Sequence, residues 1–221
     1  MKKLISMLLA IVLATGVYTA IPLAVSAAEI KSEPNDSQSG TTGDCTWTLD
    51  DNGTLTISGN GAMADYRDSV PWCNLSVPVK SVVFEKGVTY IGNESFEGCK
   101  TLESVTFSDT ITKIGDRAFQ SCTALESVEI PGNIKSFGRF TFATNKGLKT
   151  VVIDDGVQDL GYGAFEGDRN LEKITIPASV TNIDMSTLGE DGNVTIYGYK
   201  GSDAERYADF WYIPFVDISE Y

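Results

Sequence analysis

Six residues near the middle of the chain, Leu125-Glu126-Ser127-Val128-Glu129-Ile130, recur along the sequence at intervals of 23 residues. Segments with the same arrangement of apolar residues begin at positions 79, 102, 148 and 171. A fixed interval of this length is typical of repeat proteins, in which each repeat forms one coil and neighbouring coils stack. The interval therefore predicts a solenoid before any single helix or strand is considered.

The rest of the 23-residue unit keeps the same register. Three columns of apolar residues and one column of glycines recur with it: Val88, Ile111, Ile134, Val157 and Val180; Ile91, Ile114, Phe137, Leu160 and Ile183; Phe96, Phe119, Phe142, Phe165 and Leu188; and Gly92, Gly115, Gly138 and Gly161. We expect the apolar columns to form the core, because one coil cannot bury them without its neighbours. The glycines indicate a tight turn. Five repeats are predicted, at residues 79–193.

Each repeat should contain one short strand. The pattern L-x-x-V-x-I alternates apolar and polar residues at its end, as in a half-buried strand. Pro131, Gly132 and Pro177 would then turn the chain. The stretch around Gly-x-x-Ala-Phe has room for only a helical turn or two. The predicted fold class is a repeat solenoid with one parallel β-sheet and short helical or 3-10 turns on its convex side.

Two segments resemble the consensus of a known family, the BspA-like leucine-rich-repeat proteins of bacterial surfaces and secretions. They are Ile114-Gly115-Asp116-Arg117-Ala118-Phe119-Gln120-Ser121-Cys122 and Leu125-Glu126-Ser127-Val128-Glu129-Ile130-Pro131. The resemblance covers residues 44–218. It implies a leucine-rich-repeat fold, an association with adhesion and with host or matrix binding, and no catalytic residues. Because the family is a scaffold with many ligands, the resemblance indicates the fold more sharply than the function.

The segments on either side of the repeats are expected to cap the stack. Residues 44–78 contain two alternating stretches around Asn52-Gly53, which predict a β-hairpin similar to the one before the first repeat in this family. Residues 194–221 predict a last short strand and a small helix, since Ser202 and Glu205 have the spacing of a capping box. Such caps protect the ends of a sheet from pairing with other chains.

The N-terminal residues have the pattern of a secretory signal peptide. Lys2 and Lys3 precede an apolar stretch, and the small residues Val25-Ser26-Ala27 offer a cleavage site, so residues 1–28 are predicted to be removed. An uncleaved membrane anchor is the alternative. Residues 29–43 lack core-forming side chains and are predicted to be a disordered linker. The expected protein is secreted, with association to a cell surface left open, and has no stable membrane insertion after signal removal.

The composition argues against several classes of function. The formal charge is −13, or −15 without Lys2 and Lys3, whereas nucleic acids and anionic membranes require basic surfaces. The chain contains no histidine, which removes the usual general base and the commonest transition-metal ligand. We therefore expect a binding protein that is not an enzyme and holds no metal or cofactor. A monomer is expected, although the sequence does not decide the oligomeric state. A hydrolase that uses only carboxylates is a weaker alternative.

Four cysteines, Cys45, Cys73, Cys99 and Cys122, form no C-x-x-C pair and so indicate no zinc or redox motif. Cys99 and Cys122 are equivalent in successive coils, and the spacing of about 4.8 Å between stacked strands suits a disulfide by distance. Their Cβ atoms should point in parallel, however, which favours two buried thiols. A Cys45–Cys73 disulfide in the N-terminal cap is an open alternative.

Alternation assigns each residue of the predicted strand to one face of the sheet. The first, fourth and sixth residues point inward, and the second, third and fifth point outward. Solenoids commonly bind ligands on such a face, so its side chains are the predicted site for a protein or glycan ligand outside the cell. The alternative is an ordinary solvated face, with the ligand contacts elsewhere on the molecule. The candidate residues are Glu103, Ser104, Thr106, Glu126, Ser127, Glu129, Thr150, Val152, Lys173 and Thr175.

The second functional hypothesis is a carbohydrate-binding accessory protein. In it, Trp47, Trp72 and Trp211 would stack on sugar rings. All three tryptophans lie in the predicted caps, where covering the apolar end of the stack is the simpler explanation.

Overall fold

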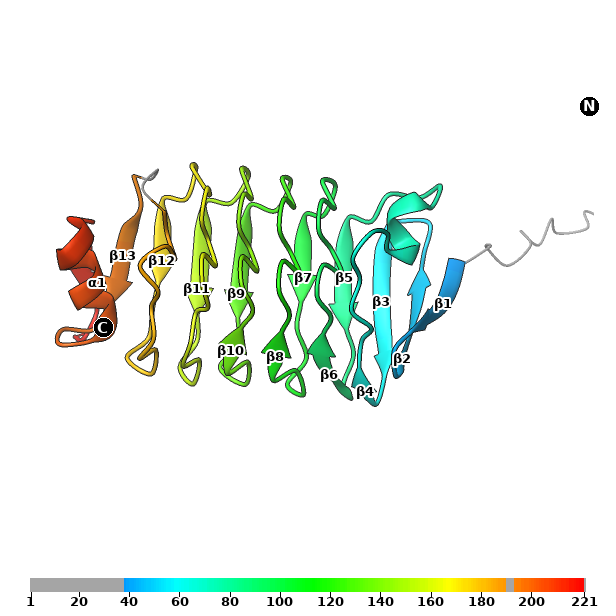
Figure 1. Ribbon diagram of the computed structural model, residues 1–221, viewed down its shortest axis with the longest axis horizontal. Coiled ribbons are helices and arrows are strands. Elements are labelled where there is room, and N and C mark those ends of the chain that lie inside the picture. Colours follow the sequence, from blue (N-terminus) through cyan, green and yellow to red (C-terminus); the bar gives the residue numbers. More distant parts are fainter. Residues whose placement is uncertain (1–37, 190–192, 221) are drawn as a thin grey trace, which may run out of the picture. The chain divides into compact units, whose positions relative to one another are not determined.

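The computed structural model describes residues 38–189 and 193–220. Within this range the chain winds into coils that stack side by side, from strand β1 (Gln38–Thr42) to helix α1 (Asp203–Trp211) (Figure 1). The predicted signal peptide at 1–28, residues 29–37 of the predicted linker and residues 190–192 of the last predicted repeat lie outside the described residues.

One strand of each coil lies on the same side of the stack, next to the antiparallel cap strands β1 and β2 (Cys45–Leu49). The coil strands are β3 (Thr54–Gly59), β5 (Ser81–Phe84), β7 (Ser104–Thr106), β9 (Ser127–Ile130), β11 (Thr150–Ile153), β12 (Lys173–Thr175), β13 (Thr195–Gly198) and β14 (Phe215–Asp217). From β3 to β7, and again from β9 to β14, neighbours run parallel and in register. Val151 of β11, for example, pairs with Val128 and Ile174. The repeat interval thus produces the predicted parallel ladder.

The sequence analysis predicts a single parallel sheet, and this number of sheets is wrong. The described strands on this side form two sheets, β1-β2-β3-β5-β7 and β9-β11-β12-β13-β14. The ladder is interrupted between β7 and β9, which remain neighbours in the stack (Figure 1). β7 is only three residues long and its central Val105 is less buried than the equivalent Val128 of β9, so this coil is less regular than the next.

A further parallel sheet lies on a second side of the coils, where the sequence analysis predicts no strand. It contains β4 (Gly61–Ala62), β6 (Val88–Ile91), β8 (Lys113–Ile114) and β10 (Ser136–Phe137). Three of these strands are two residues long, which is too short for an alternating pattern. They form because stacking places equivalent backbone groups of successive coils within hydrogen-bonding distance.

The stretch around Gly-x-x-Ala-Phe forms turns instead of the predicted helical or 3-10 turns. The Phe119 N–H donates to the carbonyl of Thr141 at 2.8 Å, and the Phe142 N–H donates to that of Ala164 at 2.9 Å. A donor bonded to the next coil is not available for a bond within a helix. Left-handed residues such as Ser121, with φ of 61°, also interrupt helical geometry.

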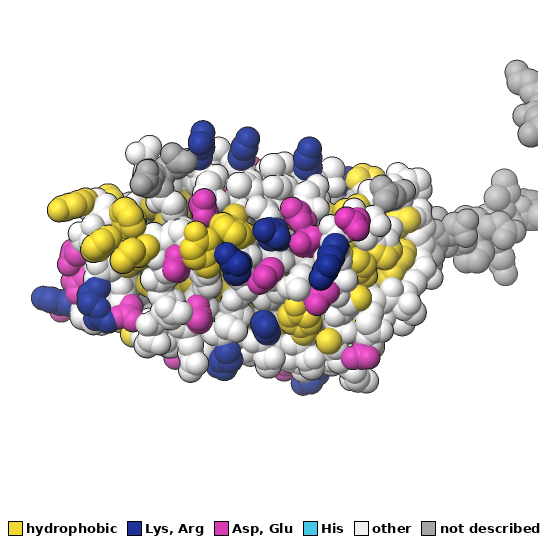
Figure 2. Space-filling model, in the orientation of Figure 1, with side chains coloured by type: hydrophobic (Ala, Val, Ile, Leu, Met, Phe, Trp, Pro, Cys, Tyr) yellow, Lys and Arg dark blue, Asp and Glu magenta, His cyan; other side chains and the backbone are white. Residues whose placement is uncertain are grey.

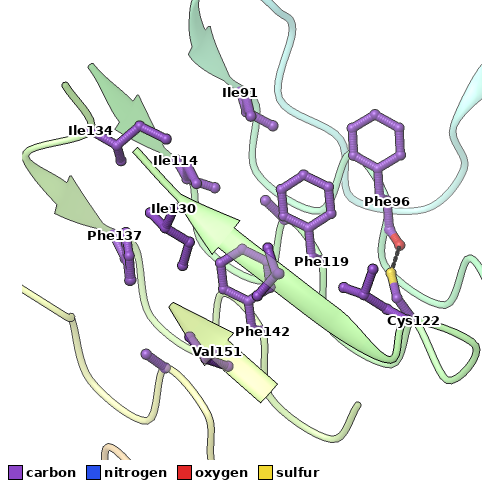
Figure 3. Close-up of a cluster of buried hydrophobic side chains, with 14 of the residues drawn as sticks. Ile91, Phe96, Ile114, Phe119, Cys122, Ile130, Ile134, Phe137, Phe142 and Val151 are labelled. Atoms are coloured by element: carbon purple, nitrogen blue, oxygen red, sulfur yellow. Dashed lines mark hydrogen bonds between the residues drawn. The ribbon is translucent and has the colours of Figure 1, made fainter. Parts of the chain in front are cut away.

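The aromatic column forms the centre of the core, as predicted. Phe96, Phe119, Phe142 and Phe165 are fully buried, and successive ring centroids are 5.1, 5.1 and 5.7 Å apart. Figure 3 shows the first three of these rings in a row beside aliphatic side chains such as Ile130. Each ring would lose its neighbour if the coils separated, so side-chain packing and the backbone ladders hold the stack together.

The sequence analysis assigns the glycine column to a tight turn. In the structure these glycines lie where the backbones of neighbouring coils come close together. A Cβ atom on Gly92 would lie 1.8 Å from the carbonyl oxygen of Ala64, and one on Gly138 would lie 2.4 Å from the backbone nitrogen of Asp116. Of the four glycines only Gly161 has a positive φ, of 70°. The column therefore exists because the backbones of successive coils touch at this position.

The N-terminal cap contains three antiparallel strands. β2 and β3 pair around Asn52-Gly53 as predicted, and β1 pairs with β2. The predicted linker at 29–43 is therefore wrong for Gln38–Thr42, the residues of β1. This strand buries only Thr42, so it lacks the apolar side chains that would identify it in the sequence.

The three tryptophans have different environments. Trp47 and Trp72 are buried in the N-terminal cap, which excludes them as a surface for sugars. Trp72 lies in the 3-10 turn η1 (Pro71–Asn74) and stacks on Phe96 at 5.4 Å, so the aromatic column continues into the cap. Trp211 is 37% exposed, and the expectation that it covers the core is wrong.

Helix α1 caps the other end of the stack, as predicted. The Ser202 side chain accepts a hydrogen bond from the Glu205 N–H, and the Glu205 carboxylate accepts one from the Gly201 N–H. Ala204, Tyr207 and Ala208 are its buried residues. Within the described part of the chain, no helix has the length and apolar character needed to cross a membrane.

Candidate functional site

The ten residues predicted as a binding site lie on one outward surface, which we call the strand face. It consists of Glu103, Ser104, Thr106, Glu126, Ser127, Glu129, Thr150, Val152, Lys173 and Thr175. Seven of them are exposed, and Thr150, Val152 and Thr175 are half-buried. The intervening Val128 and Val151 are buried, which is the alternation that the sequence predicts for these strands.

Strand pairing brings six of these residues together in two rows. The rows are Ser127, Thr150 and Lys173, and Glu129, Val152 and Thr175. Since stacked strands are about 4.8 Å apart, each row is about 10 Å long. Ser104 and Thr106 of β7 pair with residues of β5 instead, so they lie on the other side of the break in the ladder.

Charges of both signs accompany hydroxyl groups at this surface. The Lys149 ammonium lies 3.1 Å from the Glu126 carboxylate, and these side chains are 50% and 70% exposed, so the pair is weak enough for a ligand to displace. The Lys173 ammonium lies 4.3 Å from the centre of the Tyr197 ring. On the side of the molecule drawn in Figure 2, acidic and basic groups are likewise interspersed with uncharged ones.

The outward surface of the strands is longer than the sequence analysis predicts. Thr54 and Thr56 of β3 pair in register with residues of β5, so the cap hairpin extends this surface. At the other end, Thr195 and Tyr197 of β13 pair with residues of β12. The alternation of threonine with buried residues in β3 is the sequence signal for this extension, which the prediction assigns to a cap alone.

A second exposed surface, which we call the C-terminal hollow, lies where α1 meets the last coil. It has a volume of about 260 Å³, and Asn182, Met185, Arg206, Phe210 and Trp211 are among its lining residues. Met185 and Phe210 are 65% and 59% exposed. Figure 2 shows hydrophobic side chains gathered at this end of the stack. Aromatic faces beside amide and guanidinium groups suit sugar rings or apolar peptide side chains.

The four cysteines are free thiols, so neither pair considered from the sequence is bonded. Cys122 is buried and donates to the carbonyl oxygen of Phe96 at 3.2 Å (Figure 3). Cys45 donates to the carbonyl oxygen of Gly61 at 3.6 Å. Among the residues that the structure describes, no group of three or more His, Cys, Asp or Glu side chains is placed to hold a metal ion.

The repeats match a known family. Residues 72–194 contain six copies of the BspA type leucine rich repeat region, where we predict five repeats at 79–193. The chain belongs to the BspA-type leucine-rich-repeat family. Family membership confirms the resemblance drawn from the sequence, and the fold of this BspA-type chain agrees with it.

Solved structures show the same fold. A leucine-rich repeat protein from Eubacterium ventriosum is 30% identical to this BspA-type chain, with a TM-score of 0.57 and coverage of 71% of the chain and 44% of that relative. The pneumococcal vaccine antigen PcpA is 16% identical, with a TM-score of 0.52 and coverage of 75% and 51%. The chain thus spans less than half of the first relative and about half of the second. No curated protein sequence matches the chain.

Proposed function

We propose that this BspA-type protein binds a protein ligand through the strand face and does not catalyse a reaction. The observation that carries the proposal is the register of β9, β11 and β12, which aligns exposed side chains of different chemistry on a rigid backbone. A surface that is already ordered loses little conformational freedom when it binds. The lack of histidine in the sequence supports a role without catalysis.

The charges of the strand face favour a ligand with basic groups. Glu103, Glu126 and Glu129 are all exposed there, and the whole chain has a formal charge of −13. Complementary charge increases the rate at which partners meet and selects among them. The contact is therefore expected to weaken as the salt concentration rises.

The cellular location of the protein is a further part of the proposal. The signal pattern at residues 1–28 and the membership of the BspA-type family support a secreted or surface-associated protein that takes part in adhesion. The protein would act as a monomer and without a cofactor.

A binding experiment with two charge-reversal variants tests this function. Wild-type protein, a face variant (Glu103→Lys, Glu126→Lys and Glu129→Lys) and a control variant (Asp68→Lys, Glu85→Lys and Asp209→Lys) are immobilised. Each is exposed to extracts of mucus, extracellular matrix and bacterial cell wall. We expect the wild type and the control to retain the same protein, and the face variant to retain less than about a tenth as much. Circular dichroism must show that both variants are folded.

Two results would contradict the proposal. One is that the wild type retains no protein from any extract. The other is equal retention by the face variant, which would place the contact on another surface.

Carbohydrate binding is the second candidate function, and the exposed aromatic side chains of the C-terminal hollow favour it. Phe210 and Trp211 lie edge to face with ring centroids 5.2 Å apart. A glycan array would test this candidate. Binding that is lost in Trp211→Ala and kept in the face variant would support it, whereas the absence of any bound glycan would exclude it.

A further inference from the structure

Two cysteines meet where the N-terminal cap joins the repeats. The Sγ atoms of Cys73, in η1, and Cys99, in the turn after β6, are 3.3 Å apart. Bonded sulfur atoms are about 2.05 Å apart, so a shift of about 1.2 Å would join them. We propose that Cys73 and Cys99 form a reversible disulfide that fastens the cap to the first coil, made by exchange with a disulfide-bearing oxidant.

The packing around Trp72 holds the two thiols against each other. Trp72 Nε1 donates to the carbonyl of Ser95 at 2.9 Å, and the indole stacks on Phe96. Both contacts are buried, so η1 cannot leave the turn at 95–99 without opening the core. The Cys99 N–H donates to the Phe96 carbonyl at 3.1 Å, which positions Cys99 relative to the same ring. The thiols are therefore placed by the fold and not by two mobile side chains.

The two thiols differ in access and acidity. Cys73 is exposed and lines a hollow of about 350 Å³, whereas Cys99 is buried. The hydrogen bond with Cys99 lowers the pKa of Cys73. Two effects raise the pKa of Cys99. The same hydrogen bond is the larger, and burial of the thiol is the second. Because the thiolate is the nucleophile in exchange, Cys73 is the thiol that reacts first with an oxidant from solution.

The exchange takes two steps. The Cys73 thiol first loses its proton to solvent, and the thiolate attacks one sulfur of the oxidant. The S–S bond of the oxidant breaks, and one half leaves as a thiolate that takes up a proton from solvent. Cys99 then loses its proton to solvent and attacks Cys73 Sγ, which releases the second thiol of the oxidant. The protein has lost two electrons and two protons, and the oxidant has been reduced from one disulfide to two thiols.

Peptide mapping identifies the bond directly. Trypsin places each cysteine in a different peptide, namely 32–67, 68–80, 87–100 and 118–135. The full chain is treated with oxidised glutathione, free thiols are alkylated, and the digest is analysed without reductant. We expect 68–80 linked to 87–100 as the main product. Fully alkylated cysteines, or a main product that links 87–100 to 118–135 or 32–67 to 68–80, would overturn the proposal.

Thermal unfolding measures how much the Cys73–Cys99 disulfide stabilises the protein. A disulfide between residues 73 and 99 restricts the unfolded chain, so the oxidised protein should melt about 5–10 °C higher than the reduced protein. This difference should vanish in Cys73→Ser, which replaces the sulfur of an exposed side chain. It should persist in Cys122→Ser, which leaves both Cys73 and Cys99 in place. The same melting temperature with and without reductant in the cross-linked wild type would contradict a clamping role.

Discussion

Asp168 has a buried carboxyl group, and burial disfavours the charged form of this group. Its side chain is 5% exposed, Oδ1 accepts from the Asn145 N–H at 2.7 Å, and Oδ2 has no hydrogen-bond partner within the described chain. Burial raises the pKa of Asp168 to about 9. Asn145, its equivalent in the preceding coil, donates from Nδ2 to the Phe142 carbonyl at 2.6 Å. An amide is thus the better fit at this position, and a protonated carboxyl is the next best.

The pH dependence of stability tests this account of Asp168. The pKa is higher in the folded state than the ordinary 3.8, so folding takes up a proton between about pH 4 and 9. The stabilisation is complete below pH 4 and is lost as the pH rises to about 9. Asp168→Asn should remove this dependence and melt about 3–8 °C higher than the wild type at pH 9. The measurement is the melting temperature at several pH values.

The exposed Asp209 provides the control. Asp209→Asn removes the same charge at an exposed position, so its melting temperature at pH 9 should stay within about 1 °C of the wild type. If the profiles of Asp168→Asn and the wild type ran parallel, Asp168 would be charged in the folded protein and the account of its environment would be wrong.

The glycine column makes a second prediction at the scale of single residues. Gly138→Ala should lower the free energy of unfolding by about 2–4 kcal/mol, because the added Cβ meets the fixed backbone of Asp116. Gly98→Ala is the comparison, since its Cβ would meet nothing within 4 Å and only its φ of 70° opposes a side chain, at about 1–2 kcal/mol. Urea unfolding measures both. Equal losses would show that close approach between coils is not the reason for the column.

At the scale of elements, the sequence predicts the strands that have a repeated apolar pattern. It misses the strands that have no such pattern. The strands β5, β7, β9, β11 and β12 follow from apolar residues at a fixed interval, and the hairpin of β2 and β3 follows from alternation around Asn52-Gly53. β1 has Ser, Gly and Thr in place of apolar residues, so composition points to a linker. The short strands β4, β8 and β10 depend on hydrogen bonds between coils, which no local pattern encodes.

We predict that helix α1 shields the apolar end of the last coil from solvent. Tyr207 is buried, accepts from the Leu188 N–H at 3.2 Å and donates to the Met185 carbonyl at 3.3 Å. Tyr207→Ala should lower the free energy of unfolding by about 3 kcal/mol and release α1 from the stack. Uncovering the end of the solenoid should then increase self-association, measured by size-exclusion chromatography with light scattering.

Tyr212→Ala is the matched control for that experiment, because Tyr212 is 93% exposed. It should be as stable and as monodisperse as the wild type. A stable, monodisperse Tyr207→Ala protein would show that α1 is not needed as a cap.

At the scale of the whole molecule, the repeat register is enough to predict the strand face, since period-2 alternation decides which side chains point outward. The C-terminal hollow and the Cys73–Cys99 contact are different. Each joins an irregular end segment to a repeat, and the interval from Cys73 to Cys99 is 26 residues instead of 23. Contacts of this kind depend on how a cap docks, which requires coordinates.

Hydroxyl-radical footprinting of the protein with and without its captured ligand tests the central proposal most directly. Val152, Lys173 and Tyr197 report on the outward surface of the strands, and Met185, Trp211 and Tyr212 report on the C-terminal end. The account predicts that the ligand lowers the oxidation of the first three residues several-fold and leaves the last three unchanged. Protection of Met185 and Trp211 with none at Val152 would contradict it and place the binding site in the C-terminal hollow.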